Sequence, residues 1–206
     1  MLFYPTYFSP IIQYAAIAKA KDITFEICDN YQKQTYRTRC YIYSPNGLQL
    51  LNVPIKHMSG RQKTADVKID YTFNWQALHK KSLDAAYRSS PYYEFYEDEI
   101  IGFFEQKHTF LLDLNIKTFE LISEIMEWNR KVSKTISYEK VYPNKDDFRF
   151  LADAKTKRDF GLSPYPQVFS YRHGFLPNLS VLDVLFNLGP EAEGYLENSG
   201  DKIELQ

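Results

Sequence analysis

Apolar and polar positions along the chain predict strands on both sides of an N-terminal helix. Residues 1–8 and 23–28 are rich in β-branched and aromatic side chains, a composition typical of strands. Between them, Ser9-Pro10 marks a helix start, because Ser caps free N–H groups and Pro fits the first helical position. Ile12 and Ala15 follow at helical spacing. This part of the chain is predicted to fold as strand, helix, strand.

A β-hairpin is predicted next. Residues 36–44 and 48–55 have strand patterns and are separated by a turn that contains Asn46-Gly47. Asn-Gly is a strong hairpin signal because both central residues of a type I′ turn need a positive φ. A two-residue loop of this kind pairs Pro45 with Leu48 and fixes the register of both strands.

The middle third has the periodicity of amphipathic helices, and the last third is less regular. Helices are predicted at residues 75–87, 91–107 and 109–130, a strand at 133–142, loops over 146–166, and a short helix capped by Ser180 before a frayed tail beyond about Glu197. This order predicts an α/β fold: a mixed β-sheet with a prominent β-hairpin (about residues 36–55) flanked by helices, with α+β as the alternative. No repeat or linker interrupts the chain, so residues 1–206 are expected to form a single domain.

The composition is typical of a soluble globular protein. Of 206 residues, 44% are hydrophobic and 25% charged, and the formal net charge of −1 argues against a nucleic-acid-binding protein. Residues 1–18 carry no charged side chain, but they lack a positively charged n-region, and prolines interrupt their apolar stretch. No targeting segment or membrane span is therefore expected. Two cysteines without paired spacing fit a reducing compartment, and a cytoplasmic location is expected.

No motif for a metal or a cofactor is present in the sequence. The four histidines, His57, His79, His108 and His173, lack metal-ligand spacing, so no metal site is expected. The chain also lacks the glycine-rich patterns GxGxxG and GxxxxGK[ST], so no cofactor is predicted. Aromatic residues make up 17% of the chain, and their rings can stack on a sugar or a base.

Arg37 and Arg39 are the strongest functional signal. Side chains alternate along a strand, so these two arginines should point to one side of the hairpin together with Tyr41, and Lys56 should lie opposite Arg37. Guanidinium groups bind phosphate or carboxylate in a bidentate manner, and Lys33 is placed to assist. The alternative is a solvated face on which the charges serve solubility alone.

We expect the face that carries the two arginines to be covered. The helices predicted at 75–87 and 91–107 are rich in aromatic residues and need a packing surface. Burial would require partners for the arginines, since an unpaired buried charge costs several kcal/mol. Within the chain, Asp29, Glu94 and Glu97 can supply a carboxylate, and the external alternative is a ligand phosphate.

Several sequence blocks occur in a specific order along the chain. They are YFSP near the N-terminus, NYQKQTYRTR and SPNGLQLLNVPI around the hairpin, AYRSSPYYEFY in the middle, and GFLPNLSVLDVLFNLGPEA near the end. As a set, over about residues 3–196, they resemble the WbqC-like protein family. This family is associated with gene clusters for bacterial O-antigen and other surface polysaccharides, and a glycine or aminoacyl transfer to the glycan has been proposed for it.

The resemblance also implies site residues. The basic-and-amide block of the family matches Lys33, Arg37, Arg39, Asn46 and Gly47, and its acidic position after the second strand matches Asp29. Many members have Gln-Pro or His-Gln-Pro where this chain has Tyr4-Pro5.

His79 and Tyr92 are further candidates. His79 lies on one face of the helix predicted at 75–87 and has the near-neutral pKa of a general base, although such a residue is more often packed in the core. Tyr92 belongs to an aromatic cluster after Pro91 that either lines a pocket or packs against the core. Asp29 is the other candidate base.

Two functions follow from these observations. The first is a transferase in O-antigen or surface-polysaccharide biosynthesis, of the glycine/aminoacyl or glycosyl type, that acts on a phosphorylated or nucleotide-linked sugar. In it, Lys33, Arg37, Arg39, Tyr41, Asn46 and Tyr92 bind the substrate, and Asp29 or His79 acts as the base. The alternative is a non-catalytic glycan- or protein-binding module, or an assembly factor for glycan-assembly enzymes. An enzyme should bring Asp29, Arg37, Arg39 and His79 into one cleft.

Overall fold

A parallel sheet combines two strands from the start of the chain with one from its second half. The computed structural model describes residues 1–57, 60–142, 146–156, 158–201 and 203. The strands are β1 (Leu2–Phe3), β2 (Asp22–Phe25) and β5 (Lys131–Lys134), in the spatial order β1-β2-β5. Leu2 pairs with Thr24 and Ile23 with Val132, both in parallel register. The strand predicted at 133–142 is thus confirmed in part, since it begins and ends earlier.

Helix α1 (Ile11–Lys19) connects β1 to β2, as the sequence predicts. Every residue of α1 except Lys19 is buried, because the helix is apolar on all sides and lies in the core. Its N-cap is Pro10 rather than Ser9, since the Ser9 hydroxyl instead forms a hydrogen bond with the hydroxyl of Thr6.

The hairpin consists of β3 (Arg39–Ser44) and β4 (Gly47–Asn52) and has a different register from the predicted one. Ser44 pairs with Gly47, so the two-residue loop is Pro45-Asn46 and not Asn46-Gly47. The fixed φ of proline suits a turn position, and only Gly47 takes a positive φ, of 92°. The prediction that Lys56 lies opposite Arg37 is therefore also wrong.

The two faces of the hairpin are covered by different elements. Helix α2 (Trp75–Tyr87) packs on the face that carries Ile42, where Gln49 donates a hydrogen bond of 2.9 Å to Ser82. The opposite face is covered in part by the loop near α5 (Ser170–His173), whose carbonyl groups accept hydrogen bonds from Tyr43. The prediction that α2 covers the hairpin face of Arg37 and Arg39 is wrong. The helix packs on the opposite face, because the apolar side chains of Cys40 and Ile42 lie there.

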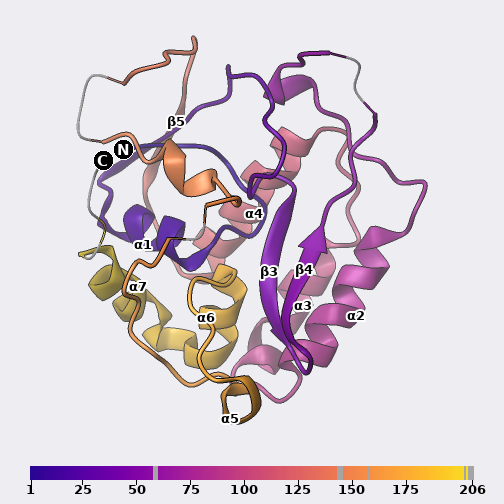
Figure 1. The fold of residues 1–206 in the computed structure, drawn as a ribbon, viewed down its shortest axis with the longest axis vertical. Helices are drawn as coiled ribbons and strands as arrows, with labels where there is room; N and C mark the ends of the chain where they lie inside the picture. Colours follow the sequence, from indigo (N-terminus) through magenta and orange to yellow (C-terminus); the bar gives the residue numbers. More distant parts are fainter. Residues whose placement is uncertain (58–59, 143–145, 157, 202, 204–206) are drawn as a thin grey trace.

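The remaining helices surround this framework. They are α3 (Tyr93–Phe103), α4 (Leu111–Ile125), α6 (Val181–Leu188) and α7 (Ala192–Gly200). Figure 1 shows the hairpin between the α2–α3 pair and the group formed by α1, α6 and α7. The tail beyond Glu197 is not frayed up to Gly200, because α7 packs along α1 there.

The α/β class is confirmed, with parallel strands, an antiparallel hairpin and flanking helices. The hairpin forms a sheet of its own, apart from the parallel strands. Among the described residues, none of the helices combines the length and the apolar character needed to cross a bilayer.

Candidate functional site

The carboxyl ends of the parallel strands gather the polar side chains of the site. Tyr4 directly follows β1, Asp29 lies a few residues beyond β2, and Tyr138 follows β5. Asp147 forms a parallel bridge with Leu2, so the chain beyond it reaches the same edge. Ligands of open α/β sheets bind outside this edge, because the loops that leave the strands diverge there.

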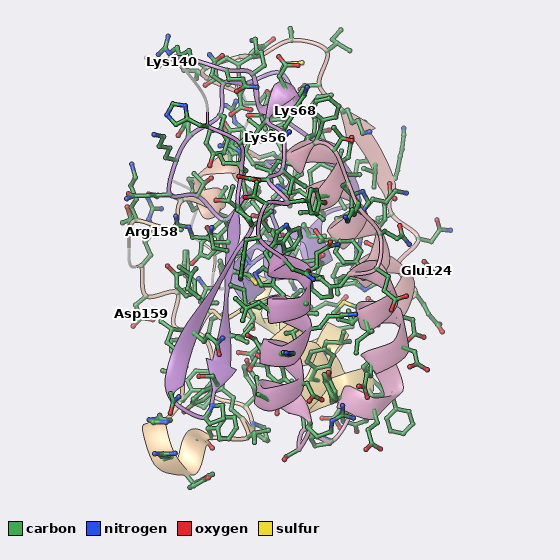
Figure 2. The ribbon with its side chains drawn as sticks, turned by 90° about the vertical axis from the view of Figure 1, so that its right-hand side faces the viewer. Lys56, Lys68, Glu124, Lys140, Arg158 and Asp159 are labelled. Carbon is green, nitrogen blue, oxygen red and sulfur yellow. The ribbon has the colours of Figure 1, made fainter. Side chains whose placement is uncertain are left out.

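A cavity of about 520 Å³ lies at this edge. Its basic lining residues are Lys33, Arg37, Lys140, Arg149, Lys155 and Arg158, and its acidic ones are Asp147 and Asp153. Among the lining side chains, six are basic and two are acidic. Two buried carboxylates behind the lining also pair with its arginines, Asp29 with Arg37 at 2.6 Å and Glu26 with Arg149 at 3.8 Å, and an excess of two positive charges remains. Lys140 and Arg158 both lie on the side of the molecule opposite Glu124 (Figure 2). A cavity of this charge attracts anions.

Arg37 lies at the floor of the cavity, and a buried carboxylate fixes its side chain. Its Nη2 donates a 2.6 Å hydrogen bond to Oδ2 of Asp29, and the two side chains are only 1% and 2% exposed. The other carboxylate oxygen of Asp29 accepts a 2.6 Å bond from the Thr64 hydroxyl. Both oxygens of Asp29 are therefore engaged within the chain. Asp29 is the internal partner that was expected for Arg37.

The guanidinium of Arg37 keeps free hydrogen-bonding capacity. Its Nε and Nη1 are buried and have no hydrogen-bond partner in the described part of the chain. A guanidinium carries five N–H donors, and a buried donor without a partner costs about 1–3 kcal/mol. Arg37 thus has buried donors at a cationic cavity, an arrangement that an anion would stabilise.

Tyr4 covers this guanidinium. The Arg37 guanidinium carbon lies 3.9 Å from the centre of the Tyr4 ring, and that of Arg149 lies 5.9 Å from it. Burial and, to a smaller extent, the nearby Asp29 carboxylate together raise the pKa of the Tyr4 hydroxyl to about 12. Tyr4 therefore stays neutral, and its ring lies near both cations at the floor of the cavity.

Arg149 fixes the wall formed by the loop after β5. Its Nε and Nη2 hold the Asp147 carboxylate at 2.9 and 2.6 Å, and its Nη1 donates a 2.7 Å bond to the Glu139 carbonyl. Burial alone would raise the pKa of Asp147, but the hydrogen bonds from Arg149 outweigh it and lower that pKa. The bond to Asp147 likewise raises the pKa of Arg149, so this pair is ionised at neutral pH.

The structure brings together three of the predicted site residues. Asp29 and Arg37 form the buried pair, and Lys33 lines the same cavity. The remaining predicted binding residues lie outside this lining: Arg39, Tyr41, Asn46 and Tyr92. Arg37 and Arg39 separate because β3 begins at Arg39, and Arg37 belongs to the turn before it.

Tyr41, Asn46 and Tyr92 have other surroundings. Tyr41 lines a second, more apolar cavity, and Asn46 is exposed at the hairpin turn. Tyr92 packs against Gly189, so closely that a Cβ atom at Gly189 would lie 2.5 Å from its ring.

His79 is a core residue. It is 1% exposed, its Nδ1 lies 2.9 Å from the Tyr7 hydroxyl, and its ring contacts Trp75 and Phe104. Burial lowers its pKa to about 4, and a hydrogen bond with the Asn52 backbone opposes this only in part. His79 does not line the cationic cavity, so the structure does not bring the four residues expected of an enzyme into one cleft.

Sequence reasoning missed the second wall of the cavity. Tyr4, Tyr138 and Arg149 line it, and so do the cations Lys155 and Arg158 of the segment predicted as loop. A signal was available: basic residues recur through DDFRFLADAKTKRDF at short intervals. No periodicity, however, could place this segment beside Arg37.

The described part of the chain contains no group of three or more His, Cys, Asp or Glu side chains arranged to hold a metal ion. The polar side chains of the site are instead dominated by cations, which suit an anionic ligand.

The fold and the site define an α/β protein with a cationic cavity at the carboxyl edge of its parallel sheet. The chain belongs to the WbqC-like protein family, whose model matches residues 5–158. It is also similar to a protein of Mycobacterium tuberculosis (strain ATCC 25618 / H37Rv) described as "Uncharacterized protein Rv1507c". The two are 27% identical over 197 residues, which cover 81% of this chain and 83% of the relative. No solved structure matches the chain.

Proposed function

We propose that the protein binds a phosphate-bearing sugar, phosphorylated or nucleotide-linked, in the cationic cavity. The setting proposed for this binding is a transfer step in the assembly of a bacterial surface polysaccharide. The observation that carries the proposal is the Arg37 guanidinium, which is buried, held by Asp29 and left with two unpartnered nitrogens beside a cavity with excess positive charge.

In this proposal the two kinds of cation have different roles. Lys33 and Lys140 are exposed at the cavity and make the first contact with the anion. Arg37 is pre-organised by Asp29 and supplies positive charge at the floor without a loss of side-chain freedom on binding. Asp29 is then a positioning residue for Arg37 and not a base, since both of its oxygens are occupied.

A specific observation favours the alternative, a non-catalytic binding module. His79 is buried away from the cavity, and Asp29 is engaged on both oxygens, so neither candidate base is free at the site. A binding module for a phosphorylated glycan needs only the cations and the aromatic side chains. Both the transferase and the binding module would bind the phosphorylated sugar in this cavity. They differ only in whether a transfer step follows.

The first prediction concerns the exposed cations. Titration calorimetry of the purified protein with pyrophosphate and with a panel of sugar phosphates should show binding that weakens as salt is added. Lys33→Gln and Lys140→Gln should each weaken binding about fivefold, because each removes an ionic contact worth about 1 kcal/mol. Lys81→Gln is the matched control, because Lys81 is also exposed but lies outside the cavity.

The results divide clearly. Loss of affinity in the two cavity variants with an unchanged control supports the proposal. If no phosphate compound binds the wild-type protein, or if Lys81→Gln weakens binding as much as Lys33→Gln does, the cavity is not the anion site and the proposal fails.

A further inference from the structure

A second cavity, of about 380 Å³, adjoins the cationic one. The two cavities share Phe150, Asp153 and Arg158 in their linings. The Arg158 guanidinium carbon lies 5.1 Å from the centre of the Phe150 ring. The shared wall is thus a cation stacked on an aromatic ring, with one cavity on each side.

The second cavity differs in chemistry from the first. Its aromatic side chains are Tyr36, Tyr41, Phe150 and Phe160, and its charged ones are Asp153 and Arg158 alone. The Tyr36 and Tyr41 rings meet nearly at right angles with their centres 6.1 Å apart. One acid and one base leave this lining without net charge, so it suits a neutral group with flat faces.

Polar atoms are nevertheless present in this aromatic cavity. Asn178 lines it, and its Oδ1 accepts a 3.0 Å bond from the Ile12 backbone. This bond directs the amide NH₂ of Asn178 away from Ile12 and fixes its position. Tyr36 and Tyr41, each of which carries a hydroxyl group, line the same cavity. A purely hydrocarbon chain would leave these polar groups without partners, which is costly.

From these features we infer that the ligand is a nucleoside diphosphate, free or sugar-linked. Its phosphates occupy the cationic cavity, and its base lies in the aromatic cavity, stacked on tyrosine or phenylalanine rings. Arg158 lies at the junction, where the phosphates join the nucleoside. This inference rests on the proposed function and selects the nucleotide-linked sugar over a simple sugar phosphate.

The test compares two probes by titration calorimetry: pyrophosphate, which fills only the cationic cavity, and a panel of nucleoside diphosphates (UDP, GDP, ADP and TDP). At least one nucleoside diphosphate should bind about tenfold more tightly than pyrophosphate, since base stacking adds to the phosphate contacts. Ala154→Phe, at a half-buried residue of the aromatic cavity alone, should remove this advantage and leave pyrophosphate binding unchanged.

A second variant makes the test independent of the folding of Ala154→Phe. Leu48 lines the aromatic cavity and is 58% exposed, whereas Leu50 on the same face of β4 is 45% exposed and outside that lining. Leu48→Ala should weaken nucleoside diphosphate binding about threefold to fivefold, and Leu50→Ala should leave it unchanged.

Three outcomes are distinguishable. The inference is supported if a nucleoside diphosphate binds more tightly than pyrophosphate and if Ala154→Phe removes this advantage or Leu48→Ala reduces it. If pyrophosphate binds and no nucleoside diphosphate binds more tightly, or if both variants bind nucleotide like the wild type, the inference is overturned and the proposed function stands. If neither pyrophosphate nor any nucleotide binds, the proposed function fails and the inference fails with it.

Discussion

Burial shifts the pKa values of two ionisable residues in the core of this protein. His79 and Asp183 are both ionisable, yet both are at most 1% exposed. Burial lowers the pKa of His79, and it raises the pKa of Asp183, although Asp183 receives hydrogen bonds from Tyr87, Tyr165 and Gln167. In each case the shift favours the neutral form, because a low dielectric penalises charge of either sign.

His79 should make the stability depend on pH in a defined direction. Its pKa lies near 4 in the folded protein, against an ordinary value of 6.5, so the unfolded chain binds the proton more readily. The contribution of neutral His79 to the unfolding free energy is complete above pH 6.5 and is lost as the pH falls toward 4. It amounts to about 3 kcal/mol of unfolding free energy over that range.

Urea denaturation of the wild type and of His79→Gln at several pH values measures this effect. The variant lacks the titrating group, so the stability difference between the two should narrow from pH 7 to pH 4. The unfolding free energy of His57→Gln, a variant at an exposed histidine, should instead change with pH as that of the wild type does. A difference between wild type and His79→Gln that does not change with pH would contradict the prediction.

At the scale of elements, the contact of α7 with α1 depends on a glycine. Gly200, the last residue of α7, lies so close to α1 that a Cβ atom there would approach the Ala15 carbonyl oxygen to 2.6 Å. The same atom would lie 2.7 Å from Cγ of Lys19. Backbone cannot move aside cheaply, so the absence of a side chain permits the two helices to pack.

Gly200→Ala should therefore destabilise the protein by about 1–3 kcal/mol, the usual cost of overpacking. Gly194→Ala, in the same helix, meets no atom within 4 Å. It should stabilise the protein by up to about 1 kcal/mol, because alanine is the better helix former. Thermal unfolding followed by circular dichroism checks both, and equal melting temperatures for the two variants would rule out the close contact.

At the scale of the whole molecule, the buried Asp29–Arg37 ion pair lies at the centre of a hydrogen-bond network that joins segments distant in the sequence. Asp29 follows β2, Arg37 precedes the hairpin, and Thr64 begins a short 3-10 helix (Thr64–Asp66) beyond it. Asn115 of α4 adds to this centre by donating hydrogen bonds to the backbone carbonyls of Arg37 and Pro5, at 3.0 and 3.2 Å. The floor of the candidate site is thus also a junction of the fold.

Removing the carboxylate charge at this junction should cost stability. Asp29→Asn leaves Arg37 as a buried cation without an ionised partner, which costs about 3–5 kcal/mol. Asp22→Asn, at an exposed aspartate, should change the unfolding free energy by less than about 0.5 kcal/mol. Denaturant unfolding of both variants gives the comparison, and similar values would show that the pair contributes little.

The local elements follow from the sequence alone. Helix α2 begins and ends where its periodicity places it, because apolar spacing acts over short distances. The hairpin forms in the predicted segment for the same reason, although its two-residue turn is Pro45-Asn46 and not Asn46-Gly47. Arg37 and Asp29 are also visible in the sequence as candidate site residues, and their charges make a pairing expected once they are buried.

The cavity itself depends on tertiary structure. Tyr4, Lys140 and Arg149 come from the start and the second half of the chain, and they meet Arg37 only because parallel strands place their carboxyl ends at one edge. The different surroundings of Arg37 and Arg39 also depend on the tertiary structure. Their spacing predicts one face, but the strand begins between them, at the point where the chain turns toward Asp29. Local pattern fixes which groups are available, and long-range packing fixes which of them meet.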